Sequence, residues 1–331
     1  MLKMQVLEKE ARPVLAVDIG GTKIITAIIT ADGQVLAEAC QPTLAGEGVP
    51  AVIGRLFSAI DNLLQQNSLK TSHLRGISLA VAGPIDSKRG IVTVSPNMPD
   101  WHDVPLREMI RQRYEGETFL VNDASAAALG EHRFGAGRGI NDLVLLTLGT
   151  GIGGGIIIDG RLYGGAGGAA GEIGHMVIDV NGPACGCGRR GCLEALASGT
   201  AVARETIKRL RQGEKSSLAA MVGGRLEDIT AEKVGEAARQ GDGLAQDVLS
   251  RAAKYLGVGM ANLINIFNPQ MIILGGGMAN IGAPLLDPAR QVALAQAFPI
   301  AAGAVSIVTA ELGEAAGIYG AAAFAFGNDR R

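Results

Sequence analysis

A repeated run of strand, glycine-rich turn and strand constrains the fold of this chain more than any other feature. In the first copy, an apolar run at residues 14–19 leads through Gly20-Gly21-Thr22 into a β-branched run. In the second copy, an apolar run at residues 143–148 leads through a glycine-rich turn at residues 149–155 into a short strand at residues 156–158. Because short apolar runs bounded by glycines are typical of buried strands, the repeat predicts an internally duplicated α/β fold with a cleft between its halves.

The length of the chain agrees with a fold of two domains, since 331 residues exceed the usual size of one domain. We expect a smaller α/β domain at residues 14–122, completed by a C-terminal helix at residues 314–328. A larger α/β domain at residues 123–313 would contain a metal-binding loop. The apolar periodicity predicts helices at residues 49–66, 123–134, 195–211, 230–239, 244–267 and 314–326, and further strands at residues 34–39, 76–82, 118–121, 271–274 and 305–308.

Composition and charge exclude several classes of protein. The formal net charge is −2 and 19% of the residues are charged, so we expect no basic surface for nucleic acid. No apolar run reaches the roughly 18 residues needed to cross a membrane. Residues 1–12 carry several charges and do not form a secretory signal. We therefore expect a cytoplasmic protein that binds neither nucleic acid nor membranes.

The first glycine-rich turn, Asp18-Ile-Gly-Gly-Thr-Lys23, has the chemistry of a phosphate-binding hairpin. Glycines let backbone amides approach phosphate oxygens, the threonine hydroxyl adds a donor, and the aspartate can hold Mg²⁺ through water. No helix follows directly, so the segment is not a Walker loop. Taken alone, it is equally well explained as an ordinary hairpin turn.

A second turn of the same kind shifts the balance towards a nucleotide site. Leu148-Gly-Thr-Gly-Ile-Gly-Gly-Gly155 again combines glycines with a threonine, and a third cluster, Gly275-Gly276-Gly277, follows a predicted strand. Such a set fits ATP and Mg²⁺ held between two domains. The predicted ATP and Mg²⁺ residues are Asp18, Gly20, Gly21, Thr22, Lys23, Thr150, Gly151, Gly154, Gly276 and Gly277.

Three of the four cysteines, Cys185, Cys187 and Cys192, fall within eight positions, and His175 lies shortly before them. Without an export signal, such clustering favours metal binding by reduced thiols over a disulfide framework. Three thiolates and one imidazole form the ligand set of a closed, tetrahedral Zn²⁺ site. The sequence therefore predicts a structural zinc site at these four residues.

The segment from Glu172-Ile-Gly-His175 to Cys185-Gly-Cys-Gly-Arg-Arg-Gly-Cys192-Leu-Glu194 closely resembles the signature of the ROK family of bacterial sugar kinases and sugar-responsive repressors. The resemblance extends from residue 15 to about residue 326 and is strongest to the glucokinase branch. It implies an actin-like ATPase (ribonuclease H-like) fold with two domains and an interdomain cleft. It also implies ATP-dependent phosphorylation of the 6-hydroxyl of glucose, and a homodimer or homotetramer.

The resemblance also assigns roles to residues that are ambiguous by themselves. Asp123 follows Val121-Asn122 where a strand meets a helix, and on position alone it would be a helix N-cap. In the family, an aspartate in this Asn-Asp-Ala context is the catalytic base that accepts the proton of the sugar hydroxyl. The resemblance implies a sugar pocket formed by Gly83, Asn97, Asn122, Asp123, Glu172, His175 and Glu194.

Several functions stay open within this resemblance. The pocket residues do not distinguish glucose from N-acetylmannosamine, fructose or another hexose. A ROK repressor would carry a helix-turn-helix domain, but only 13 residues precede the first predicted strand, and both glycine-rich turns are intact. A sugar sensor without catalysis would require that Asp123 is not the base. We therefore expect a glucokinase-type enzyme, with kinases for other hexoses as the alternative and a sensor as the less favoured one.

Overall fold

The computed structural model describes residues 12–86, 88–95, 97–98 and 100–327, which form a mixed α/β structure. The strands are β1 (Val14–Ile19), β2 (Lys23–Ile29), β3 (Val35–Pro42), β4 (Gly76–Val81), β5 (Ile85–Asp86), β6 (Ile91–Val94), β7 (His102–Val104), β8 (Glu117–Asn122), β9 (Leu143–Leu148), β10 (Ile152–Ile158), β11 (Arg161–Leu162), β12 (Met271–Gly275) and β13 (Ser306–Thr309). The α-helices are α1 (Val49–Gln66), α2 (Leu106–Arg113), α3 (Asp123–Phe134), α4 (Leu193–Ala197), α5 (Gly199–Arg211), α6 (Leu218–Met221), α7 (Ala231–Arg239), α8 (Gly243–Phe267), α9 (Ala283–Gln296), α10 (Pro299–Ala304) and α11 (Ala316–Gly327).

Two five-stranded sheets repeat one topology. The first sheet has the order β3-β2-β1-β4-β8 and the second has the order β11-β10-β9-β12-β13. In each sheet the first three strands along the chain pair antiparallel, β1-β2-β3 and β9-β10-β11, and the other two strands, β4 and β8 or β12 and β13, pair in parallel. The internal duplication predicted from the two glycine-rich hairpins is therefore confirmed.

The central strands are mostly apolar because both faces of each sheet are covered. Leu15 and Val17 of β1 face one core, which lies against α1 and α2, whereas Val14 and Ala16 face α11. The second sheet packs one face on a larger core that includes α8 and α9. An edge strand, β3, alternates between half-buried and exposed residues, as expected for a strand with one covered face.

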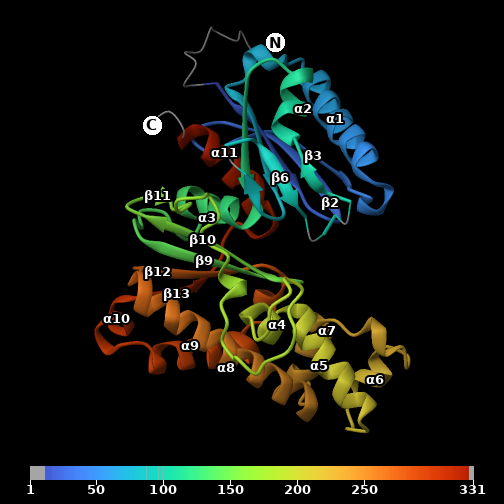
Figure 1. Cartoon of the computed structure of the whole chain (residues 1–331), viewed down its shortest axis with the longest axis vertical. Helices are drawn as coiled ribbons and strands as arrows, with labels where there is room; N and C mark the ends of the chain where they lie inside the picture. The colour runs from blue at the N-terminus through green and yellow to red at the C-terminus, as the bar shows by residue number, and fades with distance from the viewer. Residues whose placement is uncertain (1–11, 87, 96, 99, 328–331) are drawn as a thin grey trace.

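Helices α3 and α11 lie between the two sheets, where the halves of the molecule meet (Figure 1). Helix α3 follows β8 of the first sheet, but its Ala127 and Ala128 pack on β9 and β10 of the second. Helix α11 follows β13 of the second sheet, but its Ile318 and Ala322 pack on the first. Each helix thus follows a strand of one sheet and covers the other sheet.

The two helices cross at glycines. A methyl group at Gly130 of α3 would lie 2.5 Å from the carbonyl oxygen of Ala316, and one at Gly320 of α11 would overlap the carbonyl oxygen of Ala126. Only residues without a side chain allow this backbone contact. The crossing is therefore fixed by steric fit between the two backbones.

A buried carboxylate joins the ends of the same two helices. Glu131 of α3 is fully buried and accepts hydrogen bonds from the amides of Ala136, Glu311 and Leu312, at 2.8, 3.1 and 2.7 Å. A buried carboxylate needs such donors to offset its lost hydration. Glu131 therefore holds the segment that precedes α11 against the end of α3.

The secondary structure departs from the sequence prediction at the second glycine-rich turn. We predicted a turn through residue 155, but β10 begins at Ile152 and contains three of the glycines. A methyl group at Gly155 would overlap the Cβ atom of Ala128, so these glycines allow α3 to approach the strand. The glycine run therefore shapes a strand beneath a helix as well as a turn.

Other departures concern element boundaries and short elements. The predicted helix 195–211 is interrupted at Ser198, whose hydroxyl caps α5 by accepting from the amide of Ala201. The sequence prediction missed the three-stranded sheet β5-β6-β7 and the helices α2 and α9. Residue 328, the predicted end of the C-terminal helix, lies outside the described residues. Within the described ranges, no helix is both long and apolar enough to span a bilayer.

Candidate functional site

The first glycine-rich turn connects β1 to β2 and is held by a residue that the sequence analysis did not single out. Thr43 donates its hydroxyl to the carbonyl oxygen of Gly20 at 2.6 Å and its amide to that of Thr22 at 2.9 Å. The Gly21 position touches the Asn97 loop, since a methyl group there would lie 2.7 Å from the Cβ atom of Asn97. A predicted phosphate-binding turn and a predicted sugar-pocket residue are thus neighbours.

Lys23, at the end of the same turn, forms an ion pair with Glu314, which lies just before α11. Its Nζ atom lies 2.6 Å from Oε2 of Glu314, in the segment before α11. The hydrogen bond to Glu314 raises the pKa of Lys23. No local signal in the sequence indicates this partner, because it lies 291 positions away.

Asp18 lies close enough to Asp123, at the start of α3, for the charge of Asp123 to affect its protonation. Burial and, to a smaller extent, the charge of Asp123 raise the pKa of Asp18, at the end of β1, to about 7, although the charge of Lys23 opposes the shift. Asp18 also contacts α11, since a methyl group at Gly317 would overlap its carboxylate. The end of β1 and the start of α11 therefore enclose this carboxylate.

Asp123 is the first residue of α3, and Asn122 takes the capping role instead. Oδ1 of Asn122 accepts from the amide of Ser125 at 3.0 Å, which leaves the carboxylate of Asp123 outside the helix cap. Burial, with a smaller contribution from the charge of Glu172, raises the pKa of Asp123 to about 6. Hydrogen bonds to Oδ1, from the amide of Ala124 at 2.9 Å and from Nδ2 of Asn122 at 3.0 Å, oppose it.

Gly83 joins this cluster through its backbone. Nδ2 of Asn122 also donates to the carbonyl oxygen of Gly83 at 3.1 Å. Gly83 has φ = 105°, and a methyl group there would overlap the carbonyl oxygen of Val94. The position therefore requires glycine both for its left-handed backbone and for its close neighbour.

The second glycine-rich turn, Gly149 to Gly151, is fastened to the start of α5. The amide of Gly199 donates to the carbonyl oxygen of Gly149 at 2.8 Å, and the hydroxyl of Thr200 donates to that of Thr150 at 2.8 Å. Gly276, after β12, lies against the end of β9, where a methyl group would overlap the carbonyl oxygen of Leu148. The third glycine cluster is therefore adjacent to the strand that leads into this turn.

Gly154, predicted as a nucleotide ligand, lies within β10 and not in the turn. It pairs with Leu146, and a methyl group there would lie 2.9 Å from the carbonyl oxygen of Gly171. The close approach of the Gly171 backbone explains the need for glycine at this position. A role of Gly154 in nucleotide binding stays a prediction.

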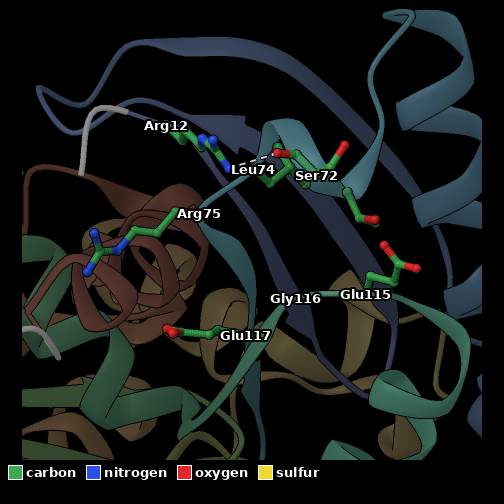
Figure 2. Close-up of a pocket in the computed structure, with 8 residues that line it drawn as sticks. Arg12, Ser72, Leu74, Arg75, Glu115, Gly116 and Glu117 are labelled. Carbon is green, nitrogen blue, oxygen red and sulfur yellow. Dashed lines mark hydrogen bonds between the residues drawn. The ribbon is translucent and has the colours of Figure 1, made fainter. Parts of the chain in front are cut away.

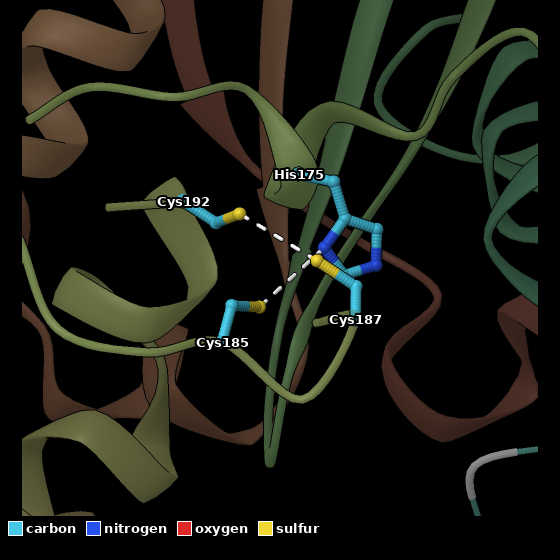
Figure 3. A group of neighbouring side chains, drawn as sticks. All are labelled: His175, Cys185, Cys187 and Cys192. Atoms are coloured by element: carbon cyan, nitrogen blue, oxygen red, sulfur yellow. Dashed lines mark hydrogen bonds between the residues drawn. The ribbon is translucent and has the colours of Figure 1, made fainter. Parts of the chain in front are cut away.

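The side chains of His175, Cys185, Cys187 and Cys192 converge on one point (Figure 3). Their ligand atoms all lie within 4.8 Å of one another. Cys185 Sγ is 3.7 Å from Nδ1 of His175, and Cys187 Sγ is 3.7 Å from Sγ of Cys192. Tetrahedral zinc with bonds of about 2.0–2.3 Å places its ligands about 3.5–3.8 Å apart. The donor set and these spacings fit a zinc ion.

Two glutamates flank this cluster, but in different ways. Oε2 of Glu172 lies 4.0 Å from Nε2 of His175, the ring nitrogen that faces away from the thiols. Oε1 of Glu194 lies 3.7 Å from Sγ of Cys185, and its Oε2 accepts from the amide of Ile152 at 3.0 Å. Glu194 therefore contacts both the cysteine cluster and the end of the second glycine-rich turn.

Two cavities lie apart from these residues. One, of about 270 Å³, lies between Arg12, Ser72 and the segment Glu115 to Glu117, where Arg12 donates to the carbonyl oxygen of Ser72 at 2.9 Å (Figure 2). The other, of about 550 Å³, runs along α5 from Thr200 to Arg211. None of the predicted site residues lines either cavity.

The fold and the site together define an actin-like protein of two halves, each with a glycine-rich hairpin in its sheet, and with Asp18 and Asp123 close to each other. Residues 14–327 match the ROK family. The chain belongs to this family, as its segment from Glu172 to Glu194 indicated.

Similar proteins include enzymes and regulators. The chain is 42% identical to the glucokinase of Thermotoga maritima over 311 residues, which cover 93% of this chain and 95% of that protein. It is 32% identical to the xylose repressor of Caldicellulosiruptor bescii over 292 residues, which cover 88% of this chain and 72% of the repressor. A ROK family glucokinase from Streptomyces griseus, solved in complex with glucose and AMPPNP, matches with a TM-score of 0.80 and 35% identity over 94% of this chain and 98% of that one. The predicted actin-like fold is confirmed.

Proposed function

We propose that this protein is an ATP-dependent glucokinase, which transfers the γ-phosphoryl group of ATP to the 6-hydroxyl of glucose. The observation that carries the proposal is the position of Asp123, at the start of α3 beside Asn122, with a pKa of about 6. The similarity to glucokinases of Thermotoga maritima and Streptomyces griseus over most of the chain supports it.

Asp123 is the general base in this proposal. A carboxylate with a pKa of about 6 is mostly ionised at neutral pH, yet it is more basic than an ordinary aspartate. It would accept the proton of the sugar hydroxyl as the hydroxyl oxygen bonds to the γ-phosphorus and ADP leaves. The hydrogen bonds from Asn122 and Ala124 fix the orientation of its carboxylate.

The nucleotide would lie between the two glycine-rich turns. The first turn, with Gly20, Gly21, Thr22 and Lys23, and the second, with Thr150 and Gly151, would supply backbone and hydroxyl donors to the phosphates. Asp18 would hold Mg²⁺ through water, and this ion would neutralise phosphate charge during transfer. Gly276 and Gly277 would border the rest of the nucleotide, and Gly154 would support the turn from within β10.

The sugar would lie beside Asp123, among the remaining predicted residues. Carboxylates and amides accept and donate hydrogen bonds in pairs, which suits neighbouring hydroxyls. The Nε2 atom of His175 points away from the cysteines and is available to a hydroxyl. We assign Gly83, Asn97, Asn122, Glu172, His175 and Glu194 to this pocket.

We assign a structural zinc ion to His175, Cys185, Cys187 and Cys192. Four protein ligands leave no open position, so the metal would order a glycine-rich loop and would not activate the substrate. By fixing Nδ1 of His175, it would also fix the direction of Nε2.

Closure of the two halves would exclude water, which otherwise competes with the sugar for the phosphoryl group. We assign residues 14–122 with the C-terminal helix to one moving unit and residues 123–313 to the other. We also expect a cytoplasmic homodimer or homotetramer, which light scattering on purified protein would test.

An ADP-release assay tests the proposed function directly. Wild-type protein would be assayed with glucose, N-acetylglucosamine, N-acetylmannosamine, mannose, fructose and allose. We expect the highest kcat/KM for glucose. A higher kcat/KM for another hexose would support the alternative of a kinase for that sugar. If none of these sugars led to ADP release, the result would favour a non-catalytic sensor, a class suggested by the similarity to the xylose repressor.

A further inference from the structure

We propose that Glu194 is a positioning residue for the second glycine-rich turn, so that the Cys/His cluster supports the nucleotide half of the site as well as the sugar half. The proposal rests on the proposed function in one respect, that the nucleotide binds at this turn. It assigns Glu194 a task beyond contact with the sugar.

The contact between Glu194 and the turn is direct. Oε2 accepts from the amide of Ile152 at 3.0 Å, immediately after the turn. A methyl group at Gly151 would overlap the same oxygen, so the turn is shaped around this carboxylate. The hydrogen bond uses a backbone donor at the first residue of β10 and thereby fixes where the turn ends and the strand begins.

The other carboxylate oxygen faces the cysteine cluster. Oε1 lies 3.7 Å from Sγ of Cys185, and Glu194 itself lies in the first turn of α4, two residues after Cys192. The amide of Leu193 donates to the carbonyl oxygen of Met176 at 2.8 Å, which fastens the start of α4 to the segment after His175. A cluster that holds Cys185 and Cys192 in place therefore also holds Glu194.

The chain after Glu194 contacts the same turn twice more. Gly199 donates to the carbonyl oxygen of Gly149 and Thr200 to that of Thr150, each at 2.8 Å. Residues 194–200 thus form a bracket that touches the turn at Gly149, Thr150 and Ile152. Within this bracket, Glu194 provides the charged contact, and hydrogen bonds to charged groups are the stronger ones.

The role predicts a difference between two substitutions at one position. Glu194→Ala removes the acceptor, whereas Glu194→Gln keeps a carbonyl oxygen for the amide of Ile152 and places an amide donor towards Sγ of Cys185. Glu172→Ala is the matched control, because Glu172 flanks the cluster on the side of His175 Nε2.

The test is the affinity for Mg²⁺–ADP in the absence of sugar, measured by calorimetry on zinc-analysed protein. We expect Glu194→Ala to weaken binding about 10- to 100-fold, as for loss of a hydrogen bond to a charged group, and Glu194→Gln to weaken it only about three- to fivefold, because its neutral carbonyl oxygen still accepts from the amide of Ile152. Glu172→Ala should bind nucleotide like wild type while losing affinity for glucose.

Any other pattern overturns the proposal. Wild-type nucleotide affinity in Glu194→Ala would mean that the turn does not need this carboxylate, and equal losses in Glu194→Ala and Glu194→Gln would mean that the hydrogen bond is not the cause. An equal loss in Glu172→Ala would point to general disorder of the cluster. Because the assay contains no sugar and measures no turnover, its outcome is independent of whether glucose is the substrate.

Discussion

Replacing Asp123 by asparagine should abolish turnover without disturbing the fold. Asparagine keeps an oxygen that accepts the bonds from Ala124 and Asn122, at 2.9 and 3.0 Å, but it cannot take up the proton of the sugar hydroxyl. General base catalysis contributes about 10²- to 10⁴-fold to a rate, so kcat should fall by a factor in this range. Removing a recessed negative charge should also leave the melting temperature unchanged or higher.

The same residue should set the acidic limb of the pH profile. With a pKa of about 6, Asp123 is ionised at pH 7 and protonated at pH 5. The wild-type kcat/KM for glucose should therefore fall about tenfold for each pH unit below 6, since only the ionised form accepts a proton. Asp123→Asn should lose this limb along with its activity.

Kinetics by coupled ADP release, run with saturating ATP between pH 5 and 8, would check both expectations. Asp159→Asn, which alters an exposed aspartate at the end of β10, is the matched control and should behave like wild type. A kcat for Asp123→Asn within about tenfold of wild type would refute the assignment. So would a wild-type profile that is flat through pH 6.

Three further perturbations follow from the structure. Asp18→Asn should raise the free energy of unfolding at pH 7 by about 1–3 kcal/mol, because the folded protein holds the pKa of Asp18 near 7. This gain should disappear towards pH 4, where Asp18 is already protonated in the folded protein. Urea titrations at both pH values would measure the difference. Gly155→Ala should destabilise the protein by about 1–3 kcal/mol, because its methyl group would overlap Ala128. Gly54→Ala, which has open space around it in α1, should instead stabilise the protein by about 0.5–1 kcal/mol. Equal melting temperatures for the two variants would contradict this. Protein never exposed to chelator should contain about one zinc per chain, and chelation or Cys185→Ser should lower the melting temperature; metal analysis that finds none would rule out the site.

Much of the fold could be predicted because its signals are local. Helices 49–66 and 123–134 and the strand 143–148 begin and end as the periodicity indicates, since each has an apolar run bounded by clear breaks. The Cys/His cluster could also be predicted, because its four ligands lie within 18 positions of the sequence. Both the hairpins and the metal ligands could therefore be predicted from the spacing of residues that are close together in the sequence.

The remainder depends on contacts between distant segments. Glycines at residues 153–155 indicate a turn by composition, but the approach of α3 makes them part of a strand. Glu131, in an alanine-rich helix, has the pattern of a solvent-facing charge, yet amides from residues 136, 311 and 312 make its burial possible. The bonds from Glu194 to Ile152 and from Lys23 to Glu314 likewise join residues whose proximity no local pattern encodes.

Because α3 and α11 each follow one sheet and cover the other, neither half of the protein has a complete core by itself. One face of each sheet is covered by a helix that follows the other sheet along the chain, so a fragment ending after β8 would present a bare apolar face to water. Among the described residues, the backbone passes between the two sheets at α3, which links β8 to β9, and before α11, which follows β13. The first place holds Asp123, and the second holds Glu314 and Gly317, the neighbours of Lys23 and Asp18. The closure that we propose would therefore rotate the halves about segments that also carry Asp123, Glu314 and Gly317, so the residues assigned to catalysis would lie at the hinge.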